Sequence, residues 1–343
     1  NTIGPPVASK VRRLNSVKLQ AAKSEFDFML QHGICRPSKS PWASALHMVP
    51  KSNSDWRPTG DYRALNACTR PDKYPLPNLQ DFSQNLFGKK IFSIIDFVKA
   101  YNQIPVAEQD IEKTAVITPF GLFEFLYLPY GLCNAPQTFQ RFINEVLYGL
   151  DFVFAYIDDI LVASANETEH LYHLRLIFDR LKQYGLTINA SKCIFGSFEV
   201  PFLGHLVNEH GVKPLPHKVD AIVNYSKPKT LKDLRRFLGC LNFYRRFIPK
   251  AAELHAPLNA LLGGSKKGDS KTINWTAELE NSFEKCKESI VNITQLSHPA
   301  PDCQLVLFTD ASDIAVAGAL HEKTGSGYIP LSFFSKKLNN AQV

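Results

Sequence analysis

The chain has 343 residues, of which 45% are hydrophobic and 21% charged, and its formal net charge is +7. This composition supports one or two buried cores and excludes a disordered chain, while the modest positive charge permits a polyanionic partner without requiring one. The 7 cysteines stand singly, which argues against zinc and disulfides and for a reducing compartment. No apolar run approaches the roughly 18 residues of a membrane span, so we expect no membrane partner.

The first part of the chain predicts a helix and then a pair of strands. Apolar residues at helical spacing predict a helix over 16–31, which Gly33 ends. A strand over 45–51 follows, and turn residues before Trp56 predict a returning strand. Farther along, residues 91–95 predict an apolar strand that ends in Asp96.

The middle of the chain predicts strands that alternate with helices. Residues 118–125 predict a turn and a strand, and Pro136 fits the first turn of a helix that runs to about Gly149. Two apolar strands then meet at Asp158-Asp159, which predicts a hairpin with both carboxylates at its turn. A capping motif at Asn166 predicts the next helix. Together these elements predict an α/β sandwich with a mostly antiparallel sheet and helices on one face.

The last part of the chain becomes helical and basic from about Leu215. An apolar stripe with arginines outside it predicts an amphipathic helix in this region. Residues 263–270 are rich in Gly, Ser and Lys and predict a linker. A helix near 277–291 and three strands that begin near 305, 315 and 329 follow.

Two acidic sites borne on strands suggest the chemistry. A lone Asp-Asp pair is most often a solvated turn, but Asp96 supplies a second acid at the end of an apolar strand. Adjacent carboxylates repel unless a positive charge lies beside them, and hard divalent cations bind carboxylate oxygens. The pattern therefore indicates a sheet whose acids converge on a two-metal centre for phosphoryl transfer.

Three motifs together resemble those of reverse transcriptases. Tyr156-Ile157-Asp158-Asp159 resembles the YxDD box, and two further motifs stand around it in the family's order, residues 128–140 (LPYGLCNAPQTFQ) and 202–205 (FLGH). Over essentially the whole chain, this order is similar to the Gypsy/Ty3 class of long-terminal-repeat retrotransposons. The resemblance implies an α/β (α+β) right-hand polymerase fold with fingers, palm and thumb, followed by a truncated RNase H-like segment.

The resemblance also implies a division of the chain into domains. The expected segments are fingers at 1–90, palm at 91–120, a fingers/palm helix at 121–150, palm with the hairpin and primer grip at 151–212, thumb at 213–262, linker at 263–270 and an incomplete RNase H-like domain at 271–343.

The implied activity is RNA-directed DNA polymerisation, in which dNTPs are added to the 3′-hydroxyl of a primer on an RNA or DNA template. Asp96, Asp158 and Asp159 would hold two Mg²⁺ ions, with Mn²⁺ as an alternative, and Asp159 would contribute least directly. The rival interpretation is a catalytically silent, domesticated nucleic-acid-binding remnant. Loss of any of these three acids would favour that rival, and all three are present.

The family motifs imply roles for residues around the nucleotide. Arg57 and Lys51 would face the incoming triphosphate, although a solvated basic hairpin is the alternative. Tyr101 would be the steric gate beneath the sugar unless it only packs in the core, and Tyr130 would lie against the sugar and base. Lys192 would either approach the triphosphate or form a salt bridge.

Other residues would contact the template and primer. Asp61 and Arg63 would lie in a template-facing strand. Residues Phe202, Leu203 and Gly204 resemble the primer grip, where Gly204 would permit close approach to the nucleic-acid backbone. Arg235 and Arg236 would track duplex phosphates from the thumb, with a solvated surface as the alternative.

The C-terminal strands resemble the start of an RNase H domain, with Asp310 as its leading metal ligand. The further acids of related domains lie beyond the strands present here, so we expect no RNase H activity and an uncovered sheet face. The chain starts without Met and stops at Val343, so we expect a piece of a polyprotein with protease, integrase and the rest of RNase H as partners. The expected location is the cytoplasm, in a virus-like particle, with a nuclear phase.

Overall fold

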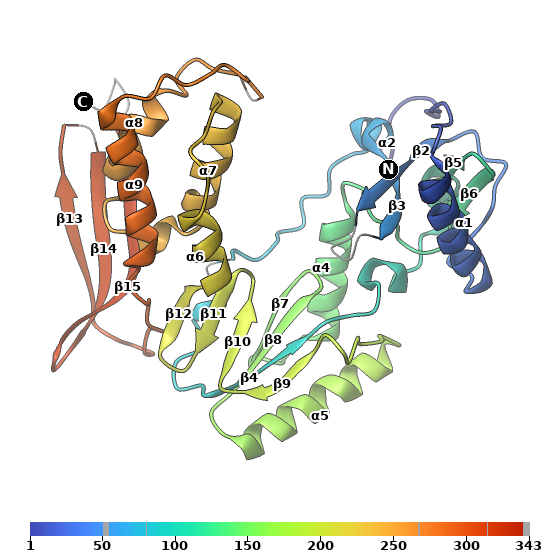
Figure 1. The fold of residues 1–343 in the computed structure, drawn as a ribbon. Coiled ribbons are helices and arrows are strands. Elements are labelled where there is room, and N and C mark those ends of the chain that lie inside the picture. Colours follow the sequence, from blue (N-terminus) through green and yellow to red (C-terminus); the bar gives the residue numbers. More distant parts are fainter. Residues whose placement is uncertain (51–54, 80, 267, 314, 339–343) are drawn as a thin grey trace. The chain divides into compact units, whose positions relative to one another are not determined.

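The computed structural model describes residues 1–50, 55–79, 81–266, 268–313 and 315–338 (Figure 1). The chain forms two compact units. The first consists of Asn1–Pro77, Ile95–Ile160 and His173–Cys193. The second consists of Asn78–Ile94, Leu161–Tyr172 and Ile194–Val343.

A helix and a five-stranded sheet form the core of the first unit. The sheet has the order β1-β6-β5-β2-β3, with β1 at Cys35–Pro37, β2 at Ser44–Pro50, β3 at Trp56–Asp61, β5 at Val116–Thr118 and β6 at Gly121–Phe125. Helix α1 (Ser16–Gln31) begins where the Asn15 side chain accepts the Lys18 N–H at 2.9 Å. Its buried Phe26 and Met29 pack into the apolar cluster that includes Phe123 of β6. The predicted helix over 16–31 is therefore confirmed.

Shorter elements complete the first unit. They are α2 (Arg63–Cys68), η2 (Ala100–Gln103), α3 (Glu108–Ile111), η3 (Glu112–Thr114), α4 (Ala135–Val146), β7 (Val153–Tyr156) and most of α5 (Glu167–Gln183). Among them, α4 has five buried residues on one face, and Pro136 lies in its first turn as predicted.

A four-stranded sheet carries the acidic motifs. Its order is β7-β8-β4-β9, with β4 at Ile91–Ile95, β8 at Asp159–Ser164 and β9 at Ile194–Ser197. All five residues of β4 are buried, as its continuous apolar sequence predicts. Strand β9 pairs antiparallel with β4, so this part agrees with the predicted antiparallel sheet.

The second unit also contains a β-meander, several helices and a second three-stranded sheet. Its elements are η1 (Asp81–Ser83), β10 (Glu199–Phe202), β11 (His205–Asn208), β12 (Gly211–Pro214), α6 (Pro216–Val223), α7 (Leu231–Phe243), η4 (Arg245–Phe247), α8 (Ala251–Ala260), α9 (Ala277–Val291), β13 (Leu305–Ala311), β14 (Ala315–Thr324) and β15 (Gly327–Lys337). Helix α9 has the predicted bounds. Thr276 caps it by accepting the Leu279 N–H.

The sheet β13-β14-β15 is partly covered. Helix α8 packs on β15, and the Ala252 N–H donates a hydrogen bond of 2.8 Å to the buried Ser335 hydroxyl. The expectation of an uncovered sheet face is therefore wrong for the face that α8 contacts. Leu305, Leu307 and Phe334 nevertheless remain exposed. No helix within the described residues is long and apolar enough to cross a membrane.

Candidate active site

The β7–β8 hairpin presents Asp158 from a strained turn. Ile157, between Tyr156 and Asp158, has φ 54°, a left-handed conformation that β-branched residues rarely adopt. Asp158 lies in the turn, whereas Asp159 is already the first residue of β8. The predicted hairpin is present, but only one of the two carboxylates sits at its turn.

Gln140 of α4 holds this turn in place. Its side chain is fully buried. Its Oε1 accepts the Ile157 N–H at 2.7 Å, and its Nε2 donates to the Ala155 carbonyl at 3.0 Å. Sequence reasoning missed this residue. The available signal was a polar side chain on the apolar face of the predicted helix, a position where glutamine needs buried partners.

Asp96 follows β4, and the segment 189–193 fixes its backbone. The Asn189 N–H donates to the Asp96 carbonyl at 2.7 Å, and the Asp96 N–H donates to Cys193 Sγ at 3.4 Å. The carboxylate Oδ1 of Asp96 is buried and accepts no hydrogen bond from the described residues. The Lys192 Nζ lies 3.8 Å from that oxygen, so the salt-bridge alternative for Lys192 is present.

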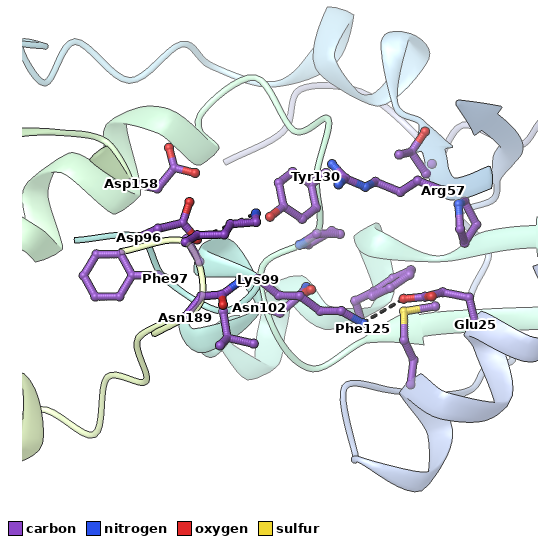
Figure 2. A pocket seen from close by; sticks show the side chains of 18 residues that line it. Glu25, Arg57, Asp96, Phe97, Lys99, Asn102, Phe125, Tyr130, Asp158 and Asn189 are labelled. Carbon is purple, nitrogen blue, oxygen red and sulfur yellow. Dashed lines mark hydrogen bonds and ion pairs between the residues drawn. The ribbon is translucent and has the colours of Figure 1, made fainter. Parts of the chain in front are cut away.

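Asp96 and Asp158 line one pocket of about 460 Å³ in the first unit. Figure 2 shows these two carboxylates at one end and Glu25 at the other, with Tyr130 and Arg57 between them. The structure therefore brings five of the predicted site residues to one cavity, namely Asp96, Asp158, Arg57, Tyr130 and Lys192.

Burial and mutual repulsion disfavour charge on the hairpin acids. Burial, and after it the charge of Asp96, raises the pKa of Asp158. Burial raises the pKa of Asp159 to about 6, and the negative charges of Asp158 and Asp96 add to the effect. Acids placed this way are stabilised in their charged form when a cation lies among them.

The acids do not by themselves form a closed metal cage. Across the part of the chain that the structure describes, no group of three or more His, Cys, Asp or Glu residues is arranged to hold an ion. Asp159 also does not line the pocket. The buried Oδ1 of Asp96 without a hydrogen bond, the repulsion among the acids and their hard oxygen donors nevertheless fit a divalent cation.

Three aromatic rings pack together beside the pocket, and of these Tyr130 lines it whereas Tyr101 and the buried Phe139 do not. Tyr101 meets Tyr130 edge to face, with centroids 5.0 Å apart, and meets Phe139 at 5.7 Å. The Arg57 guanidinium lies over Tyr130, 5.7 Å from its ring centroid. Arg57 and Tyr101 therefore share Tyr130 as a common neighbour. Lys51, the second predicted triphosphate ligand, lies outside the described residues.

Two arginines, Arg12 and Arg63, donate hydrogen bonds to Asp61. Asp61 ends β3, and Arg63 begins α2, so the prediction that both lie in one strand is wrong for Arg63. Arg63 donates two hydrogen bonds of 2.7 Å to Asp61, and Arg12 donates one of 2.5 Å. The hydrogen bonds from Arg63, and after them the one from Arg12, hold the pKa of Asp61 well below its usual range.

The primer-grip motif is a tight hairpin turn in the second unit. Leu203 and Gly204 have φ 45° and 81° and join β10 to β11 as a two-residue loop, which fits a type I′ turn. Tyr244 donates its hydroxyl to the Gly204 carbonyl at 2.8 Å, and a Cβ at Gly204 would lie 3.0 Å from the Phe243 ring. Phe243 of this chain thus makes the close contact at Gly204, where the nucleic-acid backbone was expected.

The two predicted thumb arginines differ. Arg235 donates to the Ser265 carbonyl at 2.6 Å, and its buried Nη1 has no partner among the described residues. It therefore anchors the predicted linker, and the structure does not leave it on an exposed phosphate-tracking face. Arg236 is 62% exposed and lies 3.7 Å from Asp233.

Asp310, the predicted nuclease ligand, lies at the end of β13. Its exposed carboxylate is 2.6 Å from the Lys250 ammonium. The hydrogen bond from Lys250 lowers the pKa of Asp310. Lys250, which immediately precedes α8, thus lies against the carboxylate of Asp310.

Comparisons with known families and structures agree with this geometry. Residues 49–207 match the family model described as reverse transcriptase (RNA-dependent DNA polymerase). Residues 275–343 match the model described as the RNase H-like domain found in reverse transcriptase.

The chain resembles retrotransposon polyproteins in sequence. It is 37% identical to the Transposon Tf2-3 polyprotein of Schizosaccharomyces pombe over 95% of this chain and 24% of that protein. It is also 37% identical to the retrovirus-related Pol polyprotein from transposon 297 of Drosophila melanogaster, over 100% of this chain and 32% of that protein. The chain thus spans 24% and 32% of the length of these two relatives.

The fold resembles that of foamy viral protease-reverse transcriptase. The structure of that protein with double-stranded DNA has a TM-score of 0.91 and 25% identity, over 99% of this chain and 59% of the other. Its structure with an RNA/DNA hybrid has a TM-score of 0.89 and 25% identity, over 99% of this chain and 46% of the other.

Proposed function

The chain belongs to the reverse transcriptases of Ty3/Gypsy-type retrotransposon polyproteins, and from this premise we propose that it is an RNA-directed DNA polymerase. It would add dNTPs to the 3′-hydroxyl of a primer on an RNA or DNA template. The observation that carries the proposal is the shared pocket of Asp96 and Asp158, which Arg57, Lys192 and Tyr130 also line. The carboxylates would hold metal ions, the cationic side chains would bind phosphate oxygens, and the flat ring of Tyr130 would pack against the sugar and base.

The acids would hold the metal ions. Asp96 and Asp158 would be the principal ligands of Mg²⁺ or Mn²⁺, and Asp159, outside the pocket lining, would contribute less. When bound, such ions make the primer 3′-hydroxyl a stronger nucleophile and stabilise negative charge on the transferred phosphate. The buried Oδ1 of Asp96, which accepts no hydrogen bond from the described residues, supports this assignment.

The cations of the pocket would bind the triphosphate. Arg57 offers two parallel N–H donors to phosphate oxygens, and its place over Tyr130 holds the fork at the pocket. Lys192 would exchange its 3.8 Å ion pair with Asp96 for a phosphate oxygen. Tyr101, wedged against Tyr130 and Phe139, would exclude a sugar with a 2′-hydroxyl.

The template and primer would contact several separate surfaces. Arg63, whose side chain is 85% exposed, and the turn at Leu203-Gly204 are the proposed contacts, together with the exposed Arg236. Foamy viral protease-reverse transcriptase has been solved with double-stranded DNA and with an RNA/DNA hybrid, which supports this class of partner. The relatives are polyproteins, and we propose that protease, integrase and the rest of RNase H are partners of this chain. We also propose that it works in cytoplasmic virus-like particles with a nuclear phase.

Degradation of RNA is not part of the proposal for residues 1–343. Asp310 is exposed and ion-paired with Lys250. Paired metals need several converging acids. RNA in a labelled RNA–DNA hybrid should therefore stay intact while the primer is extended.

Primer extension tests the proposal directly. The wild-type chain should extend oligo(dT) on poly(rA) with Mg²⁺ or Mn²⁺. The Asp158→Asn variant should fold but lose at least about 10³-fold in rate, because a neutral amide removes an anionic ligand. Its melting temperature should not fall, since burial and Asp96 already disfavour that charge. Near-normal extension by the folded variant would reject the two-metal assignment.

A further inference from the structure

A buried hydrogen-bonded chain runs through the sheet that carries the acids. The Ser93 hydroxyl of β4 lies 2.6 Å from His170 Nε2, and the Ser164 hydroxyl of β8 lies 2.8 Å from His170 Nδ1. His170 is in the first turns of α5. All three side chains are buried, with exposed fractions of 0%, 0% and 3% for Ser93, Ser164 and His170.

The pattern of donors and acceptors suits a neutral imidazole. One ring nitrogen of a neutral histidine donates and the other accepts, and a serine hydroxyl can do either. The ring therefore joins β4 to β8 through two side-chain hydrogen bonds. A hydrophobic residue at position 170 could fill the space, but it would remove this partner from both hydroxyls in the core.

The Ser93 hydroxyl also accepts a backbone N–H from β9, at a point where the pairing of β9 with β4 is irregular. Phe92 pairs with Ser197 and Ile94 with Ile194, so two steps along β4 correspond to three along β9. This extra residue forms a β-bulge, in which Gly196 takes φ 61°. The Gly196 N–H donates to the Ser93 hydroxyl at 3.0 Å. The chain of bonds therefore connects β9, β4, α5 and β8.

Two further contacts hold the same elements together. The Lys90 N–H donates to the Ser164 carbonyl at 2.8 Å, and Lys89 pairs with Glu169 of α5 at 3.3 Å. The start of β4, the end of β8 and the start of α5 are thus bound at one place. We name the three side chains of Ser93, His170 and Ser164 the histidine clamp.

The clamp lies on the strands that lead to the acids. Asp96 follows Ser93 by three residues and Asp159 precedes Ser164 by five, or roughly 10 Å and 17 Å of extended strand. Because β4 and β8 are hydrogen-bonded neighbours in this sheet, we expect a change in their spacing at the clamp to alter the alignment of the residues that follow on each strand. The bulge at Gly196 lies three residues after Cys193, whose thiol contacts the Asp96 backbone.

We propose that His170 is a positioning residue of the polymerase site, which joins Ser93 to Ser164 and so fixes the spacing of the two strands that carry the acids. The inference rests on the proposed polymerase function. A merely structural role would lower stability alone. A positioning role also lowers kcat, because catalysis depends on the placement of reacting groups to within about 1 Å.

The test compares kcat for single-nucleotide addition among folded variants. His170→Ala, Ser93→Ala and Ser164→Ala should each lower kcat about 10-fold or more and leave KM for dNTP within about twofold. Ser93→Ala and Ser164→Ala remove a single oxygen and keep the test available if His170→Ala fails to fold. The double variant Ser93→Ala/His170→Ala should be no slower than His170→Ala, because the clamp acts as one unit.

His255→Ala is the matched control. His255 is buried in α8, with 6% exposed, and its Nε2 has no partner among the described residues. Its replacement should lower the melting temperature and leave kcat unchanged. The proposal is overturned if the folded clamp variants keep the wild-type kcat. It is also overturned if His255→Ala lowers kcat as much as they do, since general loosening would then explain both.

A second readout separates this inference from the proposed function. Binding of Mn²⁺ alone, followed by calorimetry, senses the placement of the acids without polymerisation. His170→Ala should bind Mn²⁺ several-fold more weakly than the wild type, and equal binding would reject the positioning role. A wild-type chain that binds Mn²⁺ but never extends a primer would refute the polymerase proposal, and the Mn²⁺ comparison would still decide the role of His170.

Discussion

The rings of Tyr101 and Tyr130 meet edge to face, with their centroids 5.0 Å apart and their planes at 74°. Phe139 supports Tyr101 from another side at 5.7 Å. A ring held between two others cannot turn away from a bulky sugar, so this contact makes Tyr101 a rigid wall. Rigidity is what a steric gate requires.

We therefore expect Tyr101→Val to accept ribonucleotides. The smaller side chain leaves room for a 2′-hydroxyl, so the ratio of kcat/KM for dNTP over rNTP should fall about 10-fold or more. Tyr130→Phe keeps the ring contact and serves as the control, with a ratio close to that of the wild type. An unchanged ratio in Tyr101→Val would identify Tyr101 as a packing residue.

The two thumb arginines should respond differently to replacement. Arg236→Ala should weaken binding of a template–primer duplex and reduce the slope of log K against log salt concentration by about 1, the effect of one lost phosphate contact. Arg235→Ala should leave the slope unchanged and lower the melting temperature, because Arg235 binds Ser265. A reduced slope for Arg235→Ala would show that this arginine leaves Ser265 when nucleic acid binds.

Gly204→Ala should destabilise the chain by about 1–2 kcal/mol in urea unfolding, the cost of a left-handed conformation for an L-residue. The new methyl group would also press on Phe243. Gly239→Ala is the control, because Gly239 lies inside α7 with open space around it. That change should stabilise the chain by up to about 1 kcal/mol. Equal effects of the two substitutions would contradict the turn geometry.

Two buried histidines predict loss of stability in mild acid. Burial, and after it the charge of Arg246, lowers the pKa of His205 to about 4. Burial, followed by the charge of Arg245, lowers that of His255 to about 4. The unfolded chain takes up these protons from about pH 6.5 downward, so the stability is fully present above pH 6.5 and is lost between pH 6.5 and 4.

The free energy of unfolding, measured in urea from pH 7.5 to 5, tests this expectation. Below pH 6.5, each of the two histidines should make the free energy of unfolding fall by up to about 1.4 kcal/mol more per pH unit. His255→Gln should remove one histidine's share of the slope. The raised pKa values of Asp158 and Asp159 act in the opposite direction, so the comparison with His255→Gln decides: identical slopes for that variant and the wild type would mean that His255 is not buried as described.

Local sequence signals predicted the elements well. The helices at 16–31 and 277–291 have the predicted bounds, because capping residues and apolar spacing act within a few residues of each other. The buried strand before Asp96 also follows from composition alone. Each of these features depends on neighbours in the chain.

Features that depend on distant residues were not predicted. Arg235 looked free on its helix, but its partner Ser265 lies 30 residues away in the segment expected to be a linker. Arg63 was assigned to a strand from the family resemblance, whereas it begins the short helix α2. Gln140 and His170 gain their roles only from strands that the fold brings to them, so no pattern around either residue shows its partners.

At Ile157, stability and precision are opposed. A left-handed β-branched residue costs on the order of 1–3 kcal/mol, and the bond from its N–H to Gln140 helps to offset that cost. Glycine would relieve the strain but would let the turn adopt many more conformations. Ile157 thus lowers the stability of the fold, and in return it limits the directions in which the Asp158 carboxylate points. Residues that relieve the strain at position 157 should therefore stabilise the fold but place the Asp158 carboxylate less precisely.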